Sequence, residues 1–417
     1  MSEVMELARR AREAAGSLAI TSSAERNGAL LAMAEGLLRH REEILDANAR
    51  DMHAAREGGT APSLLDRLEL NPQRLKSIAE ALEALVALPD PIGEVVEGHT
   101  MYNGVRLSKV RVPLGVVAMI YEARPNVTAD AAGLCLKTGN AVILRGGSLA
   151  AYSNLAMTKV LSEAAVGAGM PKGCIQSVES TSREAAEELM GLHGHIDVLI
   201  PRGGAGLIRS VVENAKVPVI ETGVGNCHVY LHGSADADMA LRIVVNAKCQ
   251  RPGVCNAAES LLVDRSAYEQ LLPPILQALE ANGVTIVGDG SVAALGAVRE
   301  VVAATEEDWA TEYLDLKISV KVVEGLDEAI SHVNTYGSKH SESIVATDYA
   351  ATQRFLAEVD AAAVYANAST RFTDGGEFGL GAEIGISTQK LHARGPMGLA
   401  ALTSSKFVAL GNGQIRE

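Results

Sequence analysis

Short apolar runs alternate with helical stretches along most of this chain, and this alternation restricts the fold more than any other feature. Strands joined by helical crossovers form parallel sheets through right-handed connections. The first series of strand-like runs comprises Gly115–Tyr121, Ala141–Arg145, Ile175–Val178, Val198–Pro201 and Pro218–Glu221, with helices at Leu149–Ala168 and Ala205–Lys216. The second series comprises Glu259–Val263, Ile318–Val323, Ser343–Ala346 and Ala363–Ala366. We therefore predict an α/β protein with two parallel-sheet domains and a cleft between them.

The segments outside these two series have different textures. Residues 1–90 show helical spacing of apolar residues, with a capping box at Ser22–Glu25 and a proline helix start at Asn71–Pro72. Glu97–Arg111 contains Asn-Gly between two extended runs, which is typical of a hairpin. This hairpin has little that it can bury by itself, and Ser404–Gln414 reads as a further strand. We expect an arm that pairs with another subunit, and hence a homodimer or a larger homo-oligomer.

Length and charge limit the partners. A chain of 417 residues is long enough for two or three domains. Its net charge of 37 − 51 = −14 repels phosphate backbones, so nucleic acid is a poor partner. The apolar run Val112–Tyr121 is about half of the ~20 residues that a membrane-spanning helix needs. With no apolar signal core at the start and no CxxC pair for zinc, we expect a cytoplasmic protein without a metal.

Cys255 is the strongest candidate nucleophile among the five cysteines. It follows a Pro-Gly turn in Arg251–Asn256 and precedes an apolar strand. A turn at a strand end exposes a side chain, and backbone N–H groups there can stabilise a thiolate and an oxyanion. The alternative for every cysteine is a small core residue. That alternative fits the remaining four better: Cys135, Cys174, Cys227 and Cys249.

Two glycine turns are candidate anion sites. Arg145–Ser148 and Pro201–Gly206 each end a strand-like run and open a helix, where free N–H groups face an anion. Neither is the dinucleotide fingerprint or a P-loop, and an ordinary glycine turn is the alternative for each. Glu221 ends another apolar run before the glycine loop 222–226, and a solvated turn glutamate is the alternative there.

Four stretches together carry a family resemblance. Val112–Val117, Tyr121–Asn126, Arg251–Ala257 and Ala329–Glu342 resemble segments of the aldehyde dehydrogenase superfamily, and most strongly of its γ-glutamyl phosphate reductase (glutamate-5-semialdehyde dehydrogenase) branch. The match runs over essentially the whole chain. It implies an aldehyde dehydrogenase-like fold with two parallel-sheet domains and a small oligomerisation arm.

The resemblance also implies roles for single residues. Cys255 matches the acyl-carrying thiol, and Asn126 matches the side-chain donor to the oxyanion. Glu221 matches the general base, 34 positions before Cys255, but an acyl-phosphate reductase must exclude water, so this role stays in doubt. Arg124 and Arg371 are candidates for the anionic groups of the substrate. The matching cofactor-binding positions are Arg145, Gly146, Ser148, Gly203, Gly204, Gly223 and Glu312.

Ser148 bears on the choice of cofactor. Many members of the superfamily carry a ribose-binding glutamate at this position. Without that negative charge a 2′-phosphate meets less repulsion, and Arg145 can pair with it. We therefore expect NADPH/NADP rather than NAD.

The resemblance implies NADPH-dependent reduction of L-glutamyl 5-phosphate to L-glutamate 5-semialdehyde and phosphate through a cysteine thioester, the second step of proline biosynthesis. The upstream glutamate kinase is then a candidate partner. One alternative is a CoA-acylating aldehyde dehydrogenase of the same superfamily, and another is a non-catalytic nucleotide-binding protein. The expected domains are a cofactor-binding domain (1–96, 112–228 and a return near 367–395), a catalytic domain (229–366) and an arm (97–111 with 396–417).

Overall fold

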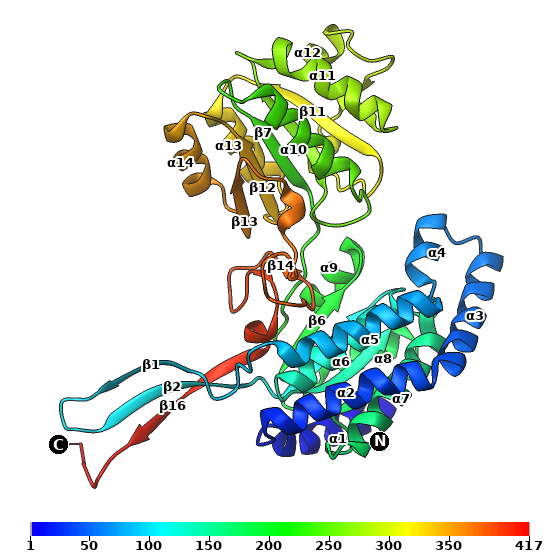
Figure 1. Cartoon of the computed structure of the whole chain (residues 1–417), viewed down its shortest axis with the longest axis vertical. Coiled ribbons are helices and arrows are strands. Elements are labelled where there is room, and N and C mark those ends of the chain that lie inside the picture. Colours follow the sequence, from blue (N-terminus) through cyan, green and yellow to red (C-terminus); the bar gives the residue numbers. More distant parts are fainter. Residues whose placement is uncertain (1, 417) are drawn as a thin grey trace. The chain divides into compact units, whose positions relative to one another are not determined.

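The structure, a computed structural model, describes residues 2–416, although not the side chains of residues 62 and 63. The chain divides into two compact units (Figure 1). Unit 1 comprises Met1–Thr222, Gly379–Gly385 and Met397–Glu417, and unit 2 comprises Gly223–Phe378 and Ile386–Pro396. Unit 2 thus begins at Gly223 rather than at residue 229. We expected the chain to rejoin the cofactor-binding domain over residues 367–395. Only Gly379–Gly385 of this range belongs to unit 1, and the rest belongs to unit 2.

Unit 1 opens with helices, as predicted. They are α1 (Glu3–Leu18), α2 (Ser23–Arg39), α3 (Arg41–Glu57), α4 (Pro62–Leu68) and α5 (Pro72–Ala87). The predicted capping box is present: Ser22 and Glu25 each bond to the backbone N–H of the other. Asn71 accepts from the N–H of Arg74 at 2.8 Å and so caps α5. These caps satisfy N–H groups that have no partner within the helix.

The sheet of unit 1 is parallel, in the order β5-β4-β3-β6, which confirms the predicted βα alternation. Its strands are β3 (Val116–Tyr121), β4 (Ala141–Gly146), β5 (Ile175–Ser177) and β6 (Val198–Arg202). Every residue of β3 is buried, as expected for a central strand. The helices between and after these strands are α6 (Pro125–Lys137), η1 (Ser148–Ala150), α7 (Ala151–Gly167), α8 (Arg183–Gly191) and α9 (Ala205–Asn214).

The fifth strand predicted for this sheet, Pro218–Glu221, was wrong. Only one isolated bridge, Val219 with Leu199, forms there. Pro218 has no N–H to donate, and the Thr222 hydroxyl already turns back to the carbonyl of Pro201 at 2.7 Å. The chain then enters unit 2 at Gly223.

The arm has the predicted hairpin and the predicted late strand. β1 (Val95–Thr100) pairs antiparallel with β2 (Arg106–Pro113), and β2 pairs antiparallel with β16 (Thr403–Leu410). The turn between β1 and β2 has Gly104 at φ 85°, a conformation that favours glycine. Figure 1 shows these three strands extending away from the helices of unit 1. The short η4 (Leu399–Leu402) precedes β16.

Unit 2 is built on a seven-stranded parallel sheet in the order β10-β9-β11-β8-β7-β12-β13. The four strands predicted for it are present, and β7, β9 and β10 are additional. The strands are β7 (Cys227–Leu231), β8 (Ala258–Asp264), β9 (Thr285–Gly288), β10 (Val302–Ala303), β11 (Lys317–Val323), β12 (Ser341–Val345) and β13 (Ala363–Ala366). Helices and short elements complete the unit: α10 (Ala237–Cys249), α11 (Tyr268–Ala281), α12 (Gly290–Ala294), η2 (Glu307–Ala310), α13 (Leu326–Tyr336), α14 (Tyr349–Glu358), η3 (Thr370–Phe372), β14 (Ile386–Ser387) and β15 (Gly395–Pro396).

The core of unit 2 lies on both faces of this sheet. Leu261 and Val263 pack in one cluster of buried side chains, whereas Leu262, between them on β8, packs in another. Alternate residues of a strand point to opposite faces, so both faces are covered. All seven residues of β8 are buried, which gives the loop before this strand a rigid base.

Candidate active site

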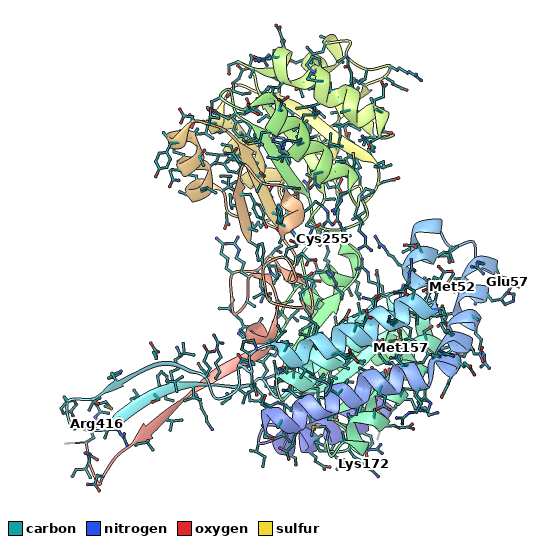
Figure 2. The ribbon with its side chains drawn as sticks, viewed as in Figure 1. Met52, Glu57, Met157, Lys172, Cys255 and Arg416 are labelled. Carbon is teal, nitrogen blue, oxygen red and sulfur yellow. The ribbon has the colours of Figure 1, made fainter. Side chains whose placement is uncertain are left out.

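Cys255 lies in the turn between α10 and β8, as predicted, and its residue is partly exposed. Cys135, Cys174 and Cys227 are fully buried. Burial raises the pKa of the Cys174 thiol to about 11, and it also raises the pKa values of Cys135 and Cys227. These three thiols are therefore neutral at physiological pH, and their burial supports a core role. Figure 2 shows Cys255 at the edge of unit 2.

Gly225 packs directly against the backbone of Cys255. A Cβ placed on Gly225 would lie 1.6 Å from the carbonyl oxygen of Cys255, so only glycine fits. The N–H of Gly225 donates to Oε1 of Glu312 at 2.7 Å. The structure therefore brings together two predicted residues, Cys255 and Glu312, with Gly225 between them.

Gly223 has a similar packing constraint. Its N–H donates to the carbonyl oxygen of Ile386 at 2.8 Å, and a Cβ would lie 2.1 Å from Cγ2 of Thr388. This predicted cofactor-binding glycine is thus required by the protein's own packing. A contribution of Gly223 to cofactor binding stays a prediction.

We call residues 251–256 the nucleophile turn, after the candidate role of Cys255. This turn is bonded on both sides to the segment around η3, which contains Arg371. Nδ2 of Asn256 donates to the carbonyl oxygens of Arg371 at 3.3 Å and Thr373 at 2.9 Å. The hydroxyl of Thr370 donates to the carbonyl oxygen of Asn256 at 2.7 Å. Nε of Arg371 donates to Oε1 of Gln250 at 2.8 Å, on the other side of Cys255. Arg371 is thus fixed relative to the nucleophile turn through its backbone and its side chain.

The Arg371 side chain is partly buried among charged neighbours. Burial lowers the pKa of Arg371, and the groups that oppose this shift include Asp374 and Cys255. Sequence reasoning proposed Arg371 but missed Gln250 and Asn256, which hold it. The available signal was the pair of amide side chains immediately around the Arg251–Cys255 turn.

The stretch Ala329–Glu342 forms buried support for this region. Glu342 accepts from the N–H of His228 at 2.7 Å and lies 3.0 Å from its Nδ1. Beside it, the thiol of Cys227 donates to the carbonyl oxygen of Cys255 at 3.1 Å. His340 is fully buried, with Nδ1 2.8 Å from the hydroxyl of Ser341. The bond from Cys227 links the turn that carries Cys255 to these buried side chains.

In unit 1, Asn126 is exposed in the first turn of α6, directly after β3. Its Nδ2 donates to Oδ2 of Asp130 at 3.0 Å. Burial raises the pKa of Asp130 to about 6, against the opposing effects of Asn126 and Arg202. Arg124, the residue before α6, is half-buried. One of the two Nδ2 hydrogens of Asn126 is therefore in use, and the other is available to a ligand.

The second glycine turn of unit 1 binds an anionic oxygen of the protein itself. Gly204 precedes α9, and its N–H donates to Oε2 of Glu122 at 3.1 Å. A Cβ on Gly203 would lie 2.7 Å from Cδ of Glu122. The carboxylate stands in for an anion at a helix N-terminus, where the backbone N–H groups favour negative charge.

The first glycine turn is partly explained by internal packing. Gly146 is buried, and a Cβ there would lie 2.0 Å from Nδ2 of Asn154. Nη2 of Arg145 donates to the carbonyl oxygens of Thr181 and Ser182, and burial lowers the pKa of this guanidinium. Ser148 is exposed at the start of η1. Glu221 is half-buried just after the isolated bridge at Val219.

Residues 2–416 contain neither a candidate membrane span nor a candidate metal site. No helix in this range is long and apolar enough to cross a membrane. No group of three or more His, Cys, Asp or Glu side chains in it could hold a metal ion.

Comparisons with known proteins agree with this architecture. A model described as "Aldehyde dehydrogenase family" matches residues 1–305. The γ-glutamyl phosphate reductase of Moorella thermoacetica is 60% identical over 415 residues, which cover 100% of this chain and 99% of that protein. That of Clostridium perfringens is 57% identical, with 100% of both chains covered.

Solved structures place the fold. The crystal structure of γ-glutamyl phosphate reductase from Thermotoga maritima matches with a TM-score of 0.97 and 48% identity, over 100% of both chains. An acetylating aldehyde dehydrogenase from Geobacillus thermoglucosidasius shares the fold at 19% identity, with a TM-score of 0.70 over 100% of this chain and 98% of that one. This chain belongs to the aldehyde dehydrogenase family, among the γ-glutamyl phosphate reductases.

Proposed function

We propose that this chain reduces L-glutamyl 5-phosphate to L-glutamate 5-semialdehyde and phosphate through a thioester on Cys255, as in the second step of proline biosynthesis. One observation carries the proposal. Cys255 is partly exposed in a turn that Gly225 and η3 fix in place, and Gly225 also contacts the carboxylate of Glu312. A fixed and accessible thiol suits attack on an acyl phosphate.

The covalent steps balance on the cysteine. The Cys255 thiolate attacks C5 of the substrate, the Sγ–C bond forms, and the C–O bond to phosphate breaks. NADPH, when bound, supplies the hydride that reduces the resulting thioester. The amide of Asn126 and the backbone N–H of Cys255 stabilise the oxyanion of the thiohemiacetal. The Sγ–C bond then breaks, which releases the aldehyde and restores the thiolate. Losing one oxyanion donor costs roughly 10²–10³ in rate.

Several residues of the chain are suited to binding the phosphate and ribose groups of NADPH. The N–H of Gly204 already donates to a carboxylate oxygen of Glu122, so an anion is accommodated at this turn. We assign the pyrophosphate to Gly203 and Gly204, and the nicotinamide ribose to Glu312. The 2′-phosphate is assigned to Arg145 and Ser148, which favours NADPH over NAD. Gly146 and Gly223 shape the backbone of the neighbouring turns.

Arg371 is the proposed phosphate ligand of the substrate. Its guanidinium lies within electrostatic range of Cys255, and Gln250 fixes its Nε, leaving the terminal nitrogens for an anion. The phosphate is bonded to the carbon that the thiol attacks, whereas the α-carboxylate lies at the other end of the substrate. Arg124 is the proposed ligand of that carboxylate. We propose no water-activating role for Glu221, because phosphate rather than water is the partner of the thioester.

Two further proposals concern the setting of the enzyme. The exposed arm of β1, β2 and β16 pairs with another subunit to form a homo-oligomer in the cytoplasm. The glutamate kinase that supplies the unstable acyl phosphate is its partner, because direct transfer limits hydrolysis. A CoA-acylating enzyme would use the same thiol but would release a thioester.

The decisive experiment runs the reaction in reverse. Purified protein with glutamate 5-semialdehyde and NADP is expected to form NADPH only when phosphate is added, and NAD should replace NADP poorly. The Cys255→Ala variant should lose at least ~10⁴-fold in turnover while still binding NADP. Turnover that requires CoA instead of phosphate would overturn the proposal, as would full activity in Cys255→Ala.

A further inference from the structure

Lys248 and Glu259 form an ion pair inside unit 2. Lys248 lies in the last turn of α10, and Glu259 is the second residue of β8. Nζ of Lys248 donates to Oε2 of Glu259 at 2.7 Å, and both side chains are 0% exposed. Burial of two charges costs about as much as their attraction returns, so such a pair adds little stability over apolar residues of similar size. Its presence beside the nucleophile turn therefore has another explanation.

The second oxygen of Glu259 supports a strained turn. Oε1 accepts from the backbone N–H of Leu314 at 3.1 Å. Leu314 adopts φ 55°, in the left-handed region that non-glycine residues disfavour by about 1 kcal/mol or more. Its side chain is exposed, so packing of the leucine does not hold this conformation. The hydrogen bond from the Leu314 N–H to Glu259 therefore helps to hold the turn in this conformation.

That turn carries Glu312. Two residues before Leu314, the Glu312 carboxylate accepts from Gly225, and Gly225 packs against the backbone of Cys255. The contacts thus run from Lys248 to Glu259, through the 312–314 turn and Gly225, to the backbone of Cys255. Burial raises the pKa of Glu259 to about 7, and the negative charge of Glu312 contributes to this rise. The two carboxylates therefore interact.

We propose that the Lys248–Glu259 pair positions Glu312 for the nicotinamide ribose of the cofactor. Lys248 favours the ionised form of the Glu259 carboxylate and orients it. Glu259 in turn holds the Leu314 N–H and so sets where the Glu312 carboxylate lies. The inference rests on the proposed function of Glu312. We do not propose that Lys248 or Glu259 contacts the cofactor. Both are positioning residues.

Two double variants isolate the bond to Leu314. Lys248→Met with Glu259→Leu removes the charges and the acceptor, whereas Lys248→Met with Glu259→Gln removes the charges but keeps an acceptor oxygen. Apolar replacement of a buried pair is usually tolerated. The Kd for NADP, measured by calorimetry without turnover, should be roughly tenfold weaker in the Leu variant than in the Gln variant, as for one lost buried hydrogen bond. Circular dichroism and melting of both proteins report their folding.

The same comparison in a Glu312→Ala background shows whether the effect passes through Glu312. There the two double variants should have equal Kd values within about twofold. Equal Kd values with Glu312 present, or a ratio that persists without it, would overturn the inference. If the Leu variant does not fold, Glu259→Asp, which keeps the charge but withdraws it from Leu314, must give the same pattern. If Glu312→Ala alone leaves the Kd unchanged, the ribose assignment fails instead.

Discussion

Three candidate residues of unit 1 and three of unit 2 lie at opposite ends of their strands. In unit 1, Asn126 follows β3, Ser148 follows β4 and Gly204 follows β6. In unit 2, Gly225 precedes β7, Cys255 precedes β8 and Glu312 precedes β11. Carboxyl ends of parallel strands lead into helix N-termini, whose N–H groups face outward and suit anions. Amino ends receive chain segments that other side chains must hold in place.

The hydrogen bonds follow the same division. Around Cys255, glycine packing and side-chain bonds from Gln250, Asn256 and Thr370 fix the chain. In unit 1, the donors of Asn126 and Gly204 bond to single carboxylates, Asp130 and Glu122, which a ligand can replace. The Cys255 thiol thus lies in a preformed setting, whereas Asn126 and Gly204 of unit 1, proposed for the oxyanion and the pyrophosphate, each bond to one carboxylate. Four variants test this contrast.

Gly225→Ala should give the largest effect, because it breaks the preformed setting of unit 2. The added methyl group would collide with the Cys255 carbonyl, and misplacement of a reacting group by about 1 Å costs roughly 10² in rate. We expect kcat/KM to fall about 100-fold or more. Gly290→Ala, where a Cβ meets nothing within 4 Å, is the matched control and should stay within twofold of wild type. Equal activities of the two variants would contradict the close-packed setting.

Arg371→Lys should weaken the binding of phosphate but not of the semialdehyde. It therefore tests which group of the substrate Arg371 binds in unit 2. Lysine keeps the charge but loses the planar fork and the bond to Gln250. In the reverse reaction the KM for phosphate should rise roughly 30-fold, while the KM for the semialdehyde stays unchanged. Arg354→Lys, on exposed α14, serves as control. A rise confined to the semialdehyde KM would show that Arg371 binds the carboxylate instead.

Asp130→Asn tests the carboxylate that bonds to Asn126 in unit 1, through the pH dependence of the unfolding free energy. The folded chain raises the pKa of Asp130 from 3.8 to about 6, so it favours the neutral acid. This group therefore contributes stability at low pH that is lost as pH rises through 6, and asparagine cannot titrate. The unfolding free energy of wild type relative to Asp130→Asn should fall by about 2 kcal/mol between pH 4.5 and 7.5. Urea unfolding at several pH values measures it, and a pH-independent difference would refute the assignment.

Glu122→Gln should give the smallest of the four effects, and it should strengthen the binding of NADP. Removing the charge weakens the bond to the Gly204 N–H and relieves repulsion of an incoming phosphate. The Kd for NADP should tighten about threefold, measured by calorimetry. Glu187→Gln, on the exposed part of α8, controls for net charge. An unchanged or weaker Kd in Glu122→Gln alone would show that this carboxylate does not compete with the cofactor.

Local patterns predicted much of this molecule because the causes are local. The capping box at Ser22, the proline start of α5 and the hairpin before β2 follow from neighbouring residues, and all three are present. Alternation of strands and helices predicted both parallel sheets. The turn that carries Cys255 could be placed from the Pro-Gly sequence, although the proposal that Cys255 is the nucleophile rests on the family resemblance.

The remaining features depend on residues far apart in sequence. Pro218–Glu221 looked like a strand, but the bond from Thr222 to Pro201 ends it. Gly146 and Gly223 were predicted to bind the cofactor, yet a side chain at these positions would meet Asn154 and Thr388 of the protein itself. The bond from Asn256 to Thr373 spans 117 positions, and no local pattern encodes such a pairing.

The pairing of β2 with β16 has a consequence for synthesis. Pro113 and Thr403 are neighbours in this ladder, although about 290 residues separate them along the chain. At ribosomal rates of 5–20 residues per second, β2 waits roughly 15–60 s for its partner strand. During that interval unit 2 can emerge complete, while the edge of β2 stays open. An exposed strand edge invites pairing with other chains, so the growing polypeptide is most vulnerable to misassembly at the arm, and a chaperone that shields residues 106–113 should raise the yield of native protein.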